Sequence, residues 1–377
     1  MDESLNGSRI LLTTDAVGGV WTYSLDLARE LCGSGLEVHL AVIGPAPSEQ
    51  MAEAARRIET LLIIPTELPL DWLAHRPEQI IEAGHLIARL AAENDCSIVQ
   101  LHAPALAAAG AYTMPVISVH HSCLATWWRA VHPGKAMPSD FRWRSEQLAK
   151  GLAISDAVVA PTTAHAYAVA EAYELTSPPL VVRNGRCIAE PGETDDASRR
   201  APFVLTSGRI WDAAKNVAML DRAARLLGVP IYAAGSTVGP EGEEQSLPSL
   251  RLLGSLDQDA MRLWLSQAPI YASAAVYEPF GLGVLEAAMA GCALVLSDIP
   301  VFRELWAGAC LFVPPDDEHA FADEVQRLLA DPRLLQRLSE RARRRARLFT
   351  PSSTAREMMR LYANHIALHR IGRGVAA

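Results

Sequence analysis

The sequence predicts an α/β protein with two Rossmann-like, doubly wound domains that face a central cleft. Its 377 residues are too many for one ordinary hydrophobic core and suit two domains of similar size. Apolar runs of strand length alternate with segments of helical spacing in both halves, which is the pattern of βαβ units in open parallel sheets. A polar stretch at 189–202 is typical of a linker. We therefore predict domains at 1–185 and 186–354, and the final helix at 355–377 can belong to either.

Each predicted element follows from its own run of residues. In the first half, apolar runs predict strands over 9–14, 36–44, 97–104, 115–122, 157–162 and 180–186, and helical spacing predicts helices over 20–35 and around 139–151. In the second half, the strands are expected over 202–210, 229–236, 250–256, 269–275, 292–298 and 310–315, and the helices over 216–228, 257–267, 318–348 and 353–369. This order predicts an open parallel sheet in each half.

Charge and composition exclude several classes of function. The formal net charge is −9, so the field of the whole protein repels nucleic acid and anionic membranes. No stretch approaches the roughly 20 apolar residues of a membrane span, and the acidic start is unlike a secretory signal. The six cysteines lack CxxC spacing and suit a reduced, cytoplasmic protein. We interpret the basic run at 341–349 as a solvated helix face.

Gly18 and Gly19 follow the first predicted strand and precede a helix. Parallel sheets bind ligands beyond the carboxyl ends of their strands, where loops lead into helix N-termini. Without side chains, both residues let the backbone approach a ligand or an anion closely. The pair lacks the GxGxxG spacing of a dinucleotide site, and a plain turn is an equal alternative.

Arg209 and Lys215 lie in the segment TSGRIWDAAKN, just after a strand and around the start of the next helix. Two cations near a helix N-terminus oppose the helix dipole, which favours negative charge there. An anionic ligand would resolve this conflict. Alternatively, both side chains extend into water or pair with Asp212.

Glu278 and Glu286 flank a glycine-containing turn in the segment YEPFGLGVLEAAMAG. Glu278 is expected at a strand end and Glu286 about one turn into the following helix, assuming ~3.6 residues per turn. Buried carboxylates seldom lack a partner, so we expect a ligand to partner them, and sugar or ribose hydroxyls are suitable donors. Alternatively, Glu286 is a first-turn acid that stabilises its helix.

Together these segments resemble the retaining GT-B glycosyltransferases of family 4. The resemblance runs from VGGVWTYSLDLARELCGSG through SVHHSC, VVAPTTAHA, VVRNGR and SGRIWDAAKN to EPFGLGVLEAAMAGCALVLSD and PVFRELW. Its most specific element is the E-x7-E signature, matched by Glu278 and Glu286. The resemblance implies a GT-B fold whose C-terminal helix returns to the first domain.

The resemblance also implies roles for the donor side. Arg209 and Lys215 match the pair that neutralises the donor diphosphate and stabilises the leaving nucleoside diphosphate. Glu286 matches the acid that holds the ribose hydroxyls, and Glu278 matches the acid near the donor sugar. The remaining donor contacts are implied at Gly18 and Gly19 near the diphosphate, at Gly235, Gly254, Ser255 and Leu256 around the base, and at the backbone amides of Phe280, Gly281, Leu282 and Gly283.

On the first domain, His120 matches the histidine that reaches the transferred sugar. This sequence reads HH where HD is commoner, so His121 is the alternative for that role. Without the resemblance, a histidine at a strand end is more often a structural residue. Trp127 and Trp128 either line an acceptor pocket or pack beneath a loop.

The resemblance implies metal-independent transfer of a sugar from a nucleoside diphosphate sugar, a UDP- or GDP-sugar, to an acceptor hydroxyl with retention of configuration. No cofactor and no metal site are expected, because Arg209 and Lys215 can supply the charge of a cation. We expect no nucleic-acid partner and no integral membrane association, and the sequence leaves a peripheral membrane contact open without supporting it. A nucleotide-sugar 2-epimerase and a catalytically silent nucleotide-sugar sensor are the alternatives.

Overall fold

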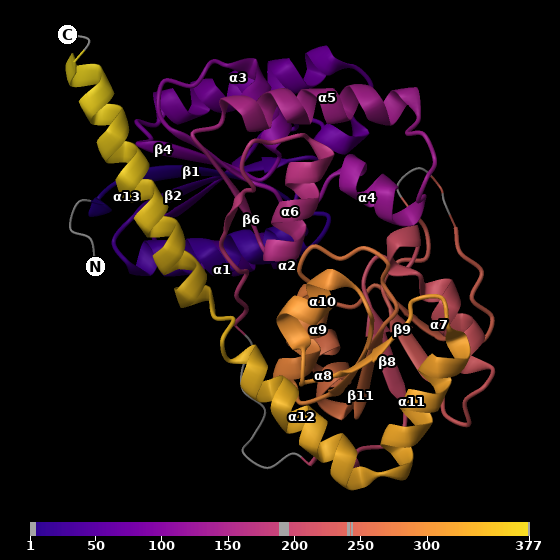
Figure 1. Cartoon of the computed structure of the whole chain (residues 1–377). Helices are drawn as coiled ribbons and strands as arrows, with labels where there is room; N and C mark the ends of the chain where they lie inside the picture. The colour runs from indigo at the N-terminus through magenta and orange to yellow at the C-terminus, as the bar shows by residue number, and fades with distance from the viewer. Residues whose placement is uncertain (1–4, 188–195, 240–241, 243, 376–377) are drawn as a thin grey trace. The chain divides into compact units, whose positions relative to one another are not determined.

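The computed structural model describes residues 5–187, 196–239, 242 and 244–375. The chain divides into two compact units, each described here by itself. Unit 1 holds residues 1–129, 134–185 and 350–377, and unit 2 holds 130–133 and 186–349. The chain leaves unit 1 after Gly185 and returns to it at Thr350, so that the C-terminal helix belongs to unit 1 (Figure 1).

Unit 1 contains a seven-stranded parallel sheet of order β3-β2-β1-β4-β5-β6-β7. Its strands are β1 (Arg9–Asp15), β2 (Glu37–Ile43), β3 (Leu61–Pro65), β4 (Ile98–Leu101), β5 (Val116–Val119), β6 (Ala157–Ala160) and β7 (Leu180–Val181). Its helices are α1 (Gly19–Gly33), α2 (Glu49–Arg56), α3 (Pro77–Glu93), α4 (Leu124–Val131), α5 (Ser139–Ile154), α6 (Thr163–Ala172) and α13 (Pro351–Val375), with short 3-10 turns η2 (Asp71–Leu73) and η3 (Pro104–Ala109).

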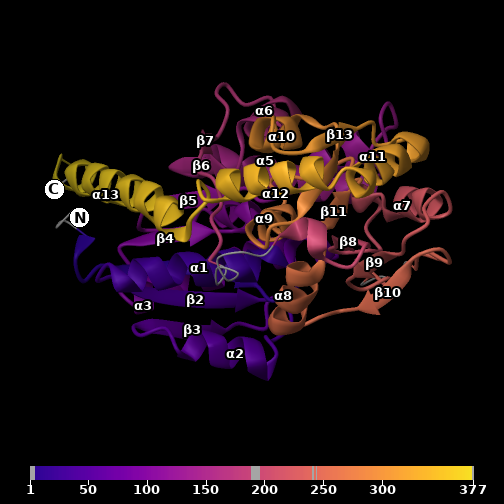
Figure 2. The same ribbon diagram turned by 90° about the horizontal axis from the view of Figure 1, so that it is seen from below.

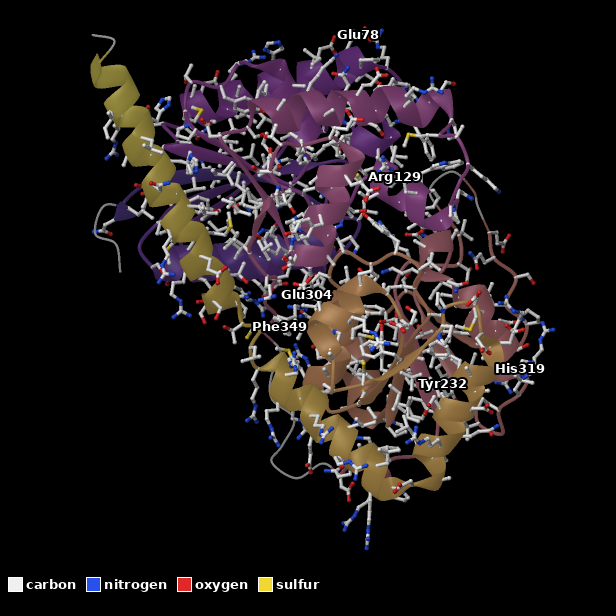
Figure 3. All side chains as sticks on the ribbon, viewed as in Figure 1. Glu78, Arg129, Tyr232, Glu304, His319 and Phe349 are labelled. Atoms are coloured by element: carbon white, nitrogen blue, oxygen red, sulfur yellow. The ribbon has the colours of Figure 1, made fainter. Side chains whose placement is uncertain are left out.

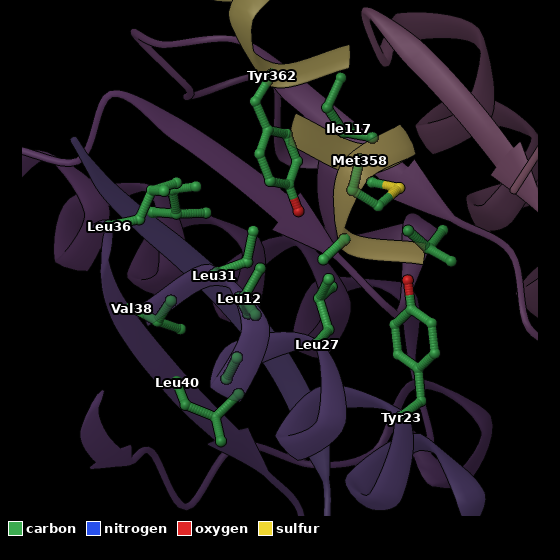
Figure 4. Packing of buried hydrophobic residues seen from close by; sticks show 14 of the residues in the cluster. Leu12, Tyr23, Leu27, Leu31, Leu36, Val38, Leu40, Ile117, Met358 and Tyr362 are labelled. Carbon is green, nitrogen blue, oxygen red and sulfur yellow. The ribbon is translucent and has the colours of Figure 1, made fainter. Parts of the chain in front are cut away.

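Alternate residues of β1 pack into two different cores. Ile10 and Leu12 point to a cluster that includes residues of α1 and α13, whereas Leu11 points to a cluster with residues of α3 and α5. Successive side chains of a strand face opposite sides of the sheet, which explains why this strand is apolar throughout. Met358 and Tyr362 of α13 lie in the first cluster (Figure 4). The C-terminal helix is therefore part of the core of unit 1.

Unit 2 contains a six-stranded parallel sheet of order β10-β9-β8-β11-β12-β13. Its strands are β8 (Val204–Ser207), β9 (Ile231–Ala234), β10 (Arg251–Gly254), β11 (Ile270–Ser273), β12 (Ala293–Ser297) and β13 (Leu311–Val313). Its helices are α7 (Val217–Ala224), α8 (Gln258–Gln267), α9 (Leu282–Met289), α10 (Pro300–Trp306), α11 (Glu318–Ala330) and α12 (Pro332–Ala346), with the 3-10 turns η4 (Ala197–Arg199) and η5 (Ala213–Lys215). Figure 2 shows α12 alongside α9.

The structure differs from the predicted elements in several places, and it adds the helices α2, α3, α4, α6 and α10 to those predicted. The predicted helix at 318–348 is two helices, α11 and α12, because Asp331 caps the second one and Pro332 cannot continue the first. Leu61–Pro65 forms an edge strand that the sequence analysis did not predict. Part of the predicted linker, 188–195, lies outside the described residues.

Both sheets reverse their strand order next to their first strand. In unit 1 the reversal lies between β1 and β4, and in unit 2 it lies between β8 and β11. Loops after neighbouring strands leave in opposite directions there and open a crevice at the carboxyl edge of the sheet. The loops that carry Gly18, Arg209 and Glu278 all start at these strands.

Candidate active site

In unit 2, the loops after β8 and β11 bring the predicted cation and carboxylate together. Lys215 ends η5, and its ammonium group donates a hydrogen bond to a carboxylate oxygen of Glu278. The side chains of Lys215 and Glu278 are only 22% and 13% exposed, so water screens this ion pair little. Two residues that are 63 positions apart in the sequence thus meet at the reversal of the strand order.

Arg209 takes a different partner. Its guanidinium donates to Asp212 Oδ2 at 2.9 Å and lies over the ring of Trp211, 5.7 Å from its centroid. Asp212 is buried and caps η5 through a bond from Ala214 N to Oδ1. Pairing with Asp212 was the alternative interpretation of both cations, and the structure shows it for Arg209. The Arg209 side chain is still 46% exposed, so its guanidinium remains accessible to an anion.

Glu286 lies in α9 and is held by a residue that the sequence analysis did not single out. Arg186 Nε donates to Glu286 Oε1 at 2.7 Å, and the Arg186 side chain is 6% exposed. The sequence analysis expected a ligand to partner both glutamates. In the structure Lys215 and Arg186 hold them, and a contact of either glutamate with a ligand stays a prediction. Arg186 directly follows the Asn184-Gly185 turn, at the carboxyl end of the predicted strand 180–186, and this position was the available signal.

Glycines let the backbone at the start of α9 approach the sheet. Gly281 is the N-cap with φ +91°, a left-handed conformation that favours glycine. A Cβ on Gly283 would lie 2.8 Å from Tyr271 Oη, which is hydrogen-bonded to Ser207 Oγ at 2.9 Å. Phe280 is buried and packs edge-on against Phe349. Phe349, labelled in Figure 3, follows α12. The backbone of 280–283 is thereby fixed above β8 and β11.

The predicted base-binding residues lie after the neighbouring strands. Gly235 N donates to Gly254 O at 2.8 Å, and a Cβ on Gly235 would lie 1.8 Å from Gly208 O. Only glycine fits at 235, where φ is +141°. Ser255 and Leu256 follow β10, which is the outermost strand and lies two strands from β8. The structure does not test their role as base contacts.

In unit 1, the first predicted site residues lie where β1 leads into α1. Gly18 is the N-cap of α1 and Gly19 its first residue, and α1 has no side-chain cap. Gly18 has an extended φ of −158°, so the glycine is not required by its conformation. The amides of the first turn are therefore without a side-chain cap, which suits an anion or a hydroxyl oxygen.

His120 and His121 follow β5 and differ in their surroundings. His120 is fully buried, and its Nδ1 lies 3.0 Å from His165 Nε2. His121 packs against the rings of Tyr23 and His102 with centroid distances of 4.7 and 5.0 Å. In the described part of the chain, Nε2 of each residue is buried without a hydrogen-bond partner. Both therefore remain candidates for the contact with the sugar.

The two predicted acceptor-side tryptophans pack on a neighbouring helix. The ring of Trp128 lies 5.6 Å from that of Phe141 in α5, and Trp128 Nε1 donates to Lys135 O at 3.1 Å. The ring of Trp127 lies 6.5 Å from the same phenylalanine. These contacts fit the packing interpretation, and an acceptor role for Trp127 and Trp128 stays a prediction.

Two observations concern metals and membranes. Within the described ranges, no group of three or more His, Cys, Asp or Glu side chains is placed to hold a metal ion. Among the helices that the structure describes, none has both the length and the apolar character needed to cross a membrane.

Comparison with known proteins identifies the family. The family model described as Glycosyltransferase Family 4 matches residues 17–188, and the one described as Glycosyl transferases group 1 matches residues 201–331. The chain belongs to the family 4 glycosyltransferases. The predicted family and its GT-B fold are thus confirmed, whereas the roles of the candidate site residues stay predictions.

Similar proteins cover nearly the whole of this glycosyltransferase. Phosphatidyl-myo-inositol mannosyltransferase of Mycolicibacterium smegmatis is 27% identical over 92% of this chain and 90% of its own length. Among solved structures, sucrose-phosphate synthase from Thermosynechococcus elongatus has a TM-score of 0.79 at 18% identity and covers 96% of this chain and 100% of its own. HepE of Anabaena in complex with UDP-glucose has a TM-score of 0.71 at 15% identity, covering 94% and 99%. At these identities, the two structures show the fold alone.

Proposed function

We propose that this glycosyltransferase moves a sugar from a nucleoside diphosphate sugar to an acceptor hydroxyl, with retention of configuration and without a metal ion. The observation that carries the proposal is the ion pair between Lys215 and Glu278 at the reversal of the strand order in unit 2. It joins the cation assigned to the diphosphate with the carboxylate assigned to the sugar. Such an arrangement suits a ligand with phosphate and hydroxyl groups side by side.

In the proposed donor complex, the diphosphate lies between Arg209, Lys215 and the first turn of α9. Arg209 is accessible, and Gly281 leaves the α9 amides without a side-chain cap. Phosphate oxygens accept hydrogen bonds from both kinds of donor. Glu286, oriented by Arg186, accepts from the ribose hydroxyls. The two cations supply the positive charge that a metal ion would otherwise give to the leaving group.

Glu278 is proposed to orient the donor sugar and to stabilise positive charge that develops on the sugar ring. Such an interaction is stronger in the transition state than in the ground state, so its removal lowers kcat. Glu278→Gln keeps the shape of the side chain and removes its charge. Unchanged turnover in this variant would exclude the role.

The name of one relative and the ligand of one similar structure support a choice of donor. One is named a mannosyltransferase, and one structure was solved with UDP-glucose. We therefore propose a UDP- or GDP-sugar as the donor. We also propose a cytoplasmic location, where thiols stay reduced, because all six cysteines are thiols in the structure.

Calorimetric titration tests the donor site. UDP, GDP, ADP and dTDP are added without metal to the wild type, to Lys215→Ala and to the control Lys150→Ala, which removes an exposed lysine of α5. We expect one nucleotide to bind, and Lys215→Ala to weaken it at least about tenfold, or about 1.4 kcal/mol, while the control leaves it unchanged. No binding of any nucleotide to the folded protein would contradict the proposal.

Product analysis tests the reaction itself. Nuclear magnetic resonance of the product distinguishes retention from inversion at the anomeric carbon, and it also distinguishes transfer from epimerisation of the donor. Assays with EDTA, and with manganese added back, test metal independence. Loss of activity in EDTA that manganese restores would refute that part of the proposal.

A further inference from the structure

The carboxyl edge of the unit 1 sheet carries carboxylates and imidazoles. Asp15 ends β1, His102 follows β4, and His120 and His121 follow β5. A fourth segment, η2, adds the carboxylate of Asp71, its first residue. These strands flank the reversal of the strand order, where open α/β sheets bind their ligands.

Two of the imidazoles at this edge, those of His102 and His121, are held neutral. Burial lowers the pKa of His102 far below its usual value, and burial with the charge of His120 lowers the pKa of His121 to about 3. His102 Nε2 lies 2.5 Å from the Gln100 side-chain amide, and its Nδ1 lies 3.1 Å from Ser24 Oγ. His102 and His121 therefore offer hydrogen bonds at neutral pH but no positive charge.

The carboxylates at this edge are close enough to affect one another. Burial raises the pKa of Asp71 to about 6, and the charge of Asp15 adds to this effect. Trp72 N donates to Asp71 Oδ1 and Val17 N donates to Asp15 Oδ1, each at 2.9 Å. Near pH 7 this edge therefore carries negative charge that acts on any ligand bound there.

Two buried imidazole nitrogen atoms at the same edge make no hydrogen bond within the described part of the chain. Nε2 of His120 and Nε2 of His121 are buried without a hydrogen-bond partner among the described residues. Leaving a buried polar atom without a partner is unfavourable, so its presence indicates a ligand or water. A hydroxyl group both donates and accepts, so it fits either tautomer of these imidazoles.

The loops at this edge carry no Lys or Arg side chain. The loops at 16–18, 102–103 and 120–123, which follow β1, β4 and β5, contain no Lys or Arg, and neither does η2. In unit 2 the corresponding loop after β8 contains both Arg209 and Lys215. The loop after β8 therefore carries two cations beside Asp212, whereas the loop after β1 follows Asp15 and carries no cation.

We infer that the acceptor of this glycosyltransferase is an uncharged polyhydroxyl compound, a sugar or polyol without phosphate or carboxylate near the attacking hydroxyl. This inference rests on the proposed function. In the reaction, an acceptor oxygen forms a bond to the anomeric carbon while the bond from that carbon to the diphosphate oxygen breaks. The nucleoside diphosphate leaves with the bonding electrons, and the acceptor proton is released. An acceptor phosphate beside Asp15 and Asp71 would be repelled.

Matched acceptor pairs test the inference. Glucose, myo-inositol and glycerol are each compared with their monophosphates, using the nucleotide sugar whose nucleotide binds in calorimetry. We expect kcat/KM for at least one neutral compound to exceed that of its phosphate about tenfold or more, which corresponds to ~1.4 kcal/mol. A phosphate that reacts as fast as its neutral counterpart overturns the inference.

Two charge-removing variants make the test specific to this edge. Asp71→Asn is expected to reduce the preference for the neutral compound several-fold, whereas Glu82→Gln, an exposed acid of α3, leaves it unchanged. Asp15→Asn replaces the first variant if thermal melting shows that Asp71→Asn is misfolded. An unchanged preference in the folded variants overturns the inference.

The remaining outcomes separate the two proposals. If the protein binds its nucleotide but transfers sugar to no compound of either set, the inference about the acceptor is wrong and the donor site stands. If no nucleotide binds, the proposed function itself is wrong.

Discussion

Replacing Arg186 by methionine should destabilise unit 2, because Glu286 would keep its charge and lose its partner. The two side chains are 6% and 20% exposed, and their hydrogen bond is 2.7 Å long. Breaking a buried ion pair from one side costs about 3–5 kcal/mol. Since Glu286 retains some contact with water, we expect about 2–3 kcal/mol, which lowers the Tm by about 5–10 °C for a unit of this size.

Thermal melting followed by tryptophan fluorescence measures this loss, since Trp306 is buried in unit 2. The matched control is Arg303→Met, which breaks an ion pair with Asp298 whose side chains are 56% and 39% exposed. Exposed pairs contribute about 0–1 kcal/mol, so this control should shift the Tm by only a few degrees.

A double variant isolates the uncompensated charge. Adding Glu286→Gln to Arg186→Met removes the charge that was left alone, so more than half of the lost stability should return. If Arg186→Met melts at the same temperature as Arg303→Met, or if the double variant recovers nothing, the pair does not hold Glu286 in the way described. Nucleotide binding by the same variants then reports whether Glu286 needs Arg186 for its orientation.

Three predictions concern unit 1. Tyr362→Phe removes the buried hydrogen bond that Tyr362 Oη donates to Gln100 Oε1 and should lower the free energy of unfolding by about 1–3 kcal/mol in urea denaturation. Burial, with a smaller effect of His120, lowers the pKa of His121 to about 3. Below about pH 6.5 the unfolded state therefore binds a proton at this residue, whereas the folded state binds it only near pH 3. Stability should therefore fall between about pH 6.5 and 3, by up to about 1.4 kcal/mol per pH unit for this group, in Tm measurements from pH 7.5 to 5. Burial alone would raise the pKa of Cys123, but His120 lowers it to about 7, so its alkylation by iodoacetamide, followed by mass spectrometry, should have its midpoint near pH 7 rather than about 8.5.

The two sheets could be predicted because parallel strands buried on both faces are continuous apolar runs. Residues 10–14 of β1 are buried without interruption, and so is the whole of β12. The edge strand at 61–65 has mostly half-exposed side chains, and its signal is correspondingly weak. The break between α11 and α12 had a local signal in Asp331 and Pro332, although the helical spacing continues across it.

The partners of the two glutamates could not be predicted in the same way. Glu278 pairs across 63 positions and Glu286 across 100, and helical or strand periodicity says nothing about such distances. The loops after the carboxyl ends of neighbouring parallel strands are predicted to lie close together. This does not predict which side chain of one loop forms an ion pair with which side chain of another. Arg186 was therefore missed, although its strand end was predicted.

The ion pairs of the two glutamates affect how the proposed donor site would work. Lys215 and Glu278 neutralise one another, as do Arg186 and Glu286, so these four side chains offer no net charge to a diphosphate. Arg209 is the more exposed cation, and its partner Asp212 is also held by Ala214 N. We therefore expect the diphosphate to meet Arg209 first. When Lys215 then turns to a phosphate oxygen, Glu278 loses its present partner and becomes an acceptor for the sugar hydroxyls. Binding of the diphosphate and orientation of the sugar are in this way coupled through one lysine, so Lys215→Ala should impair both, whereas Glu278→Gln should impair chiefly turnover.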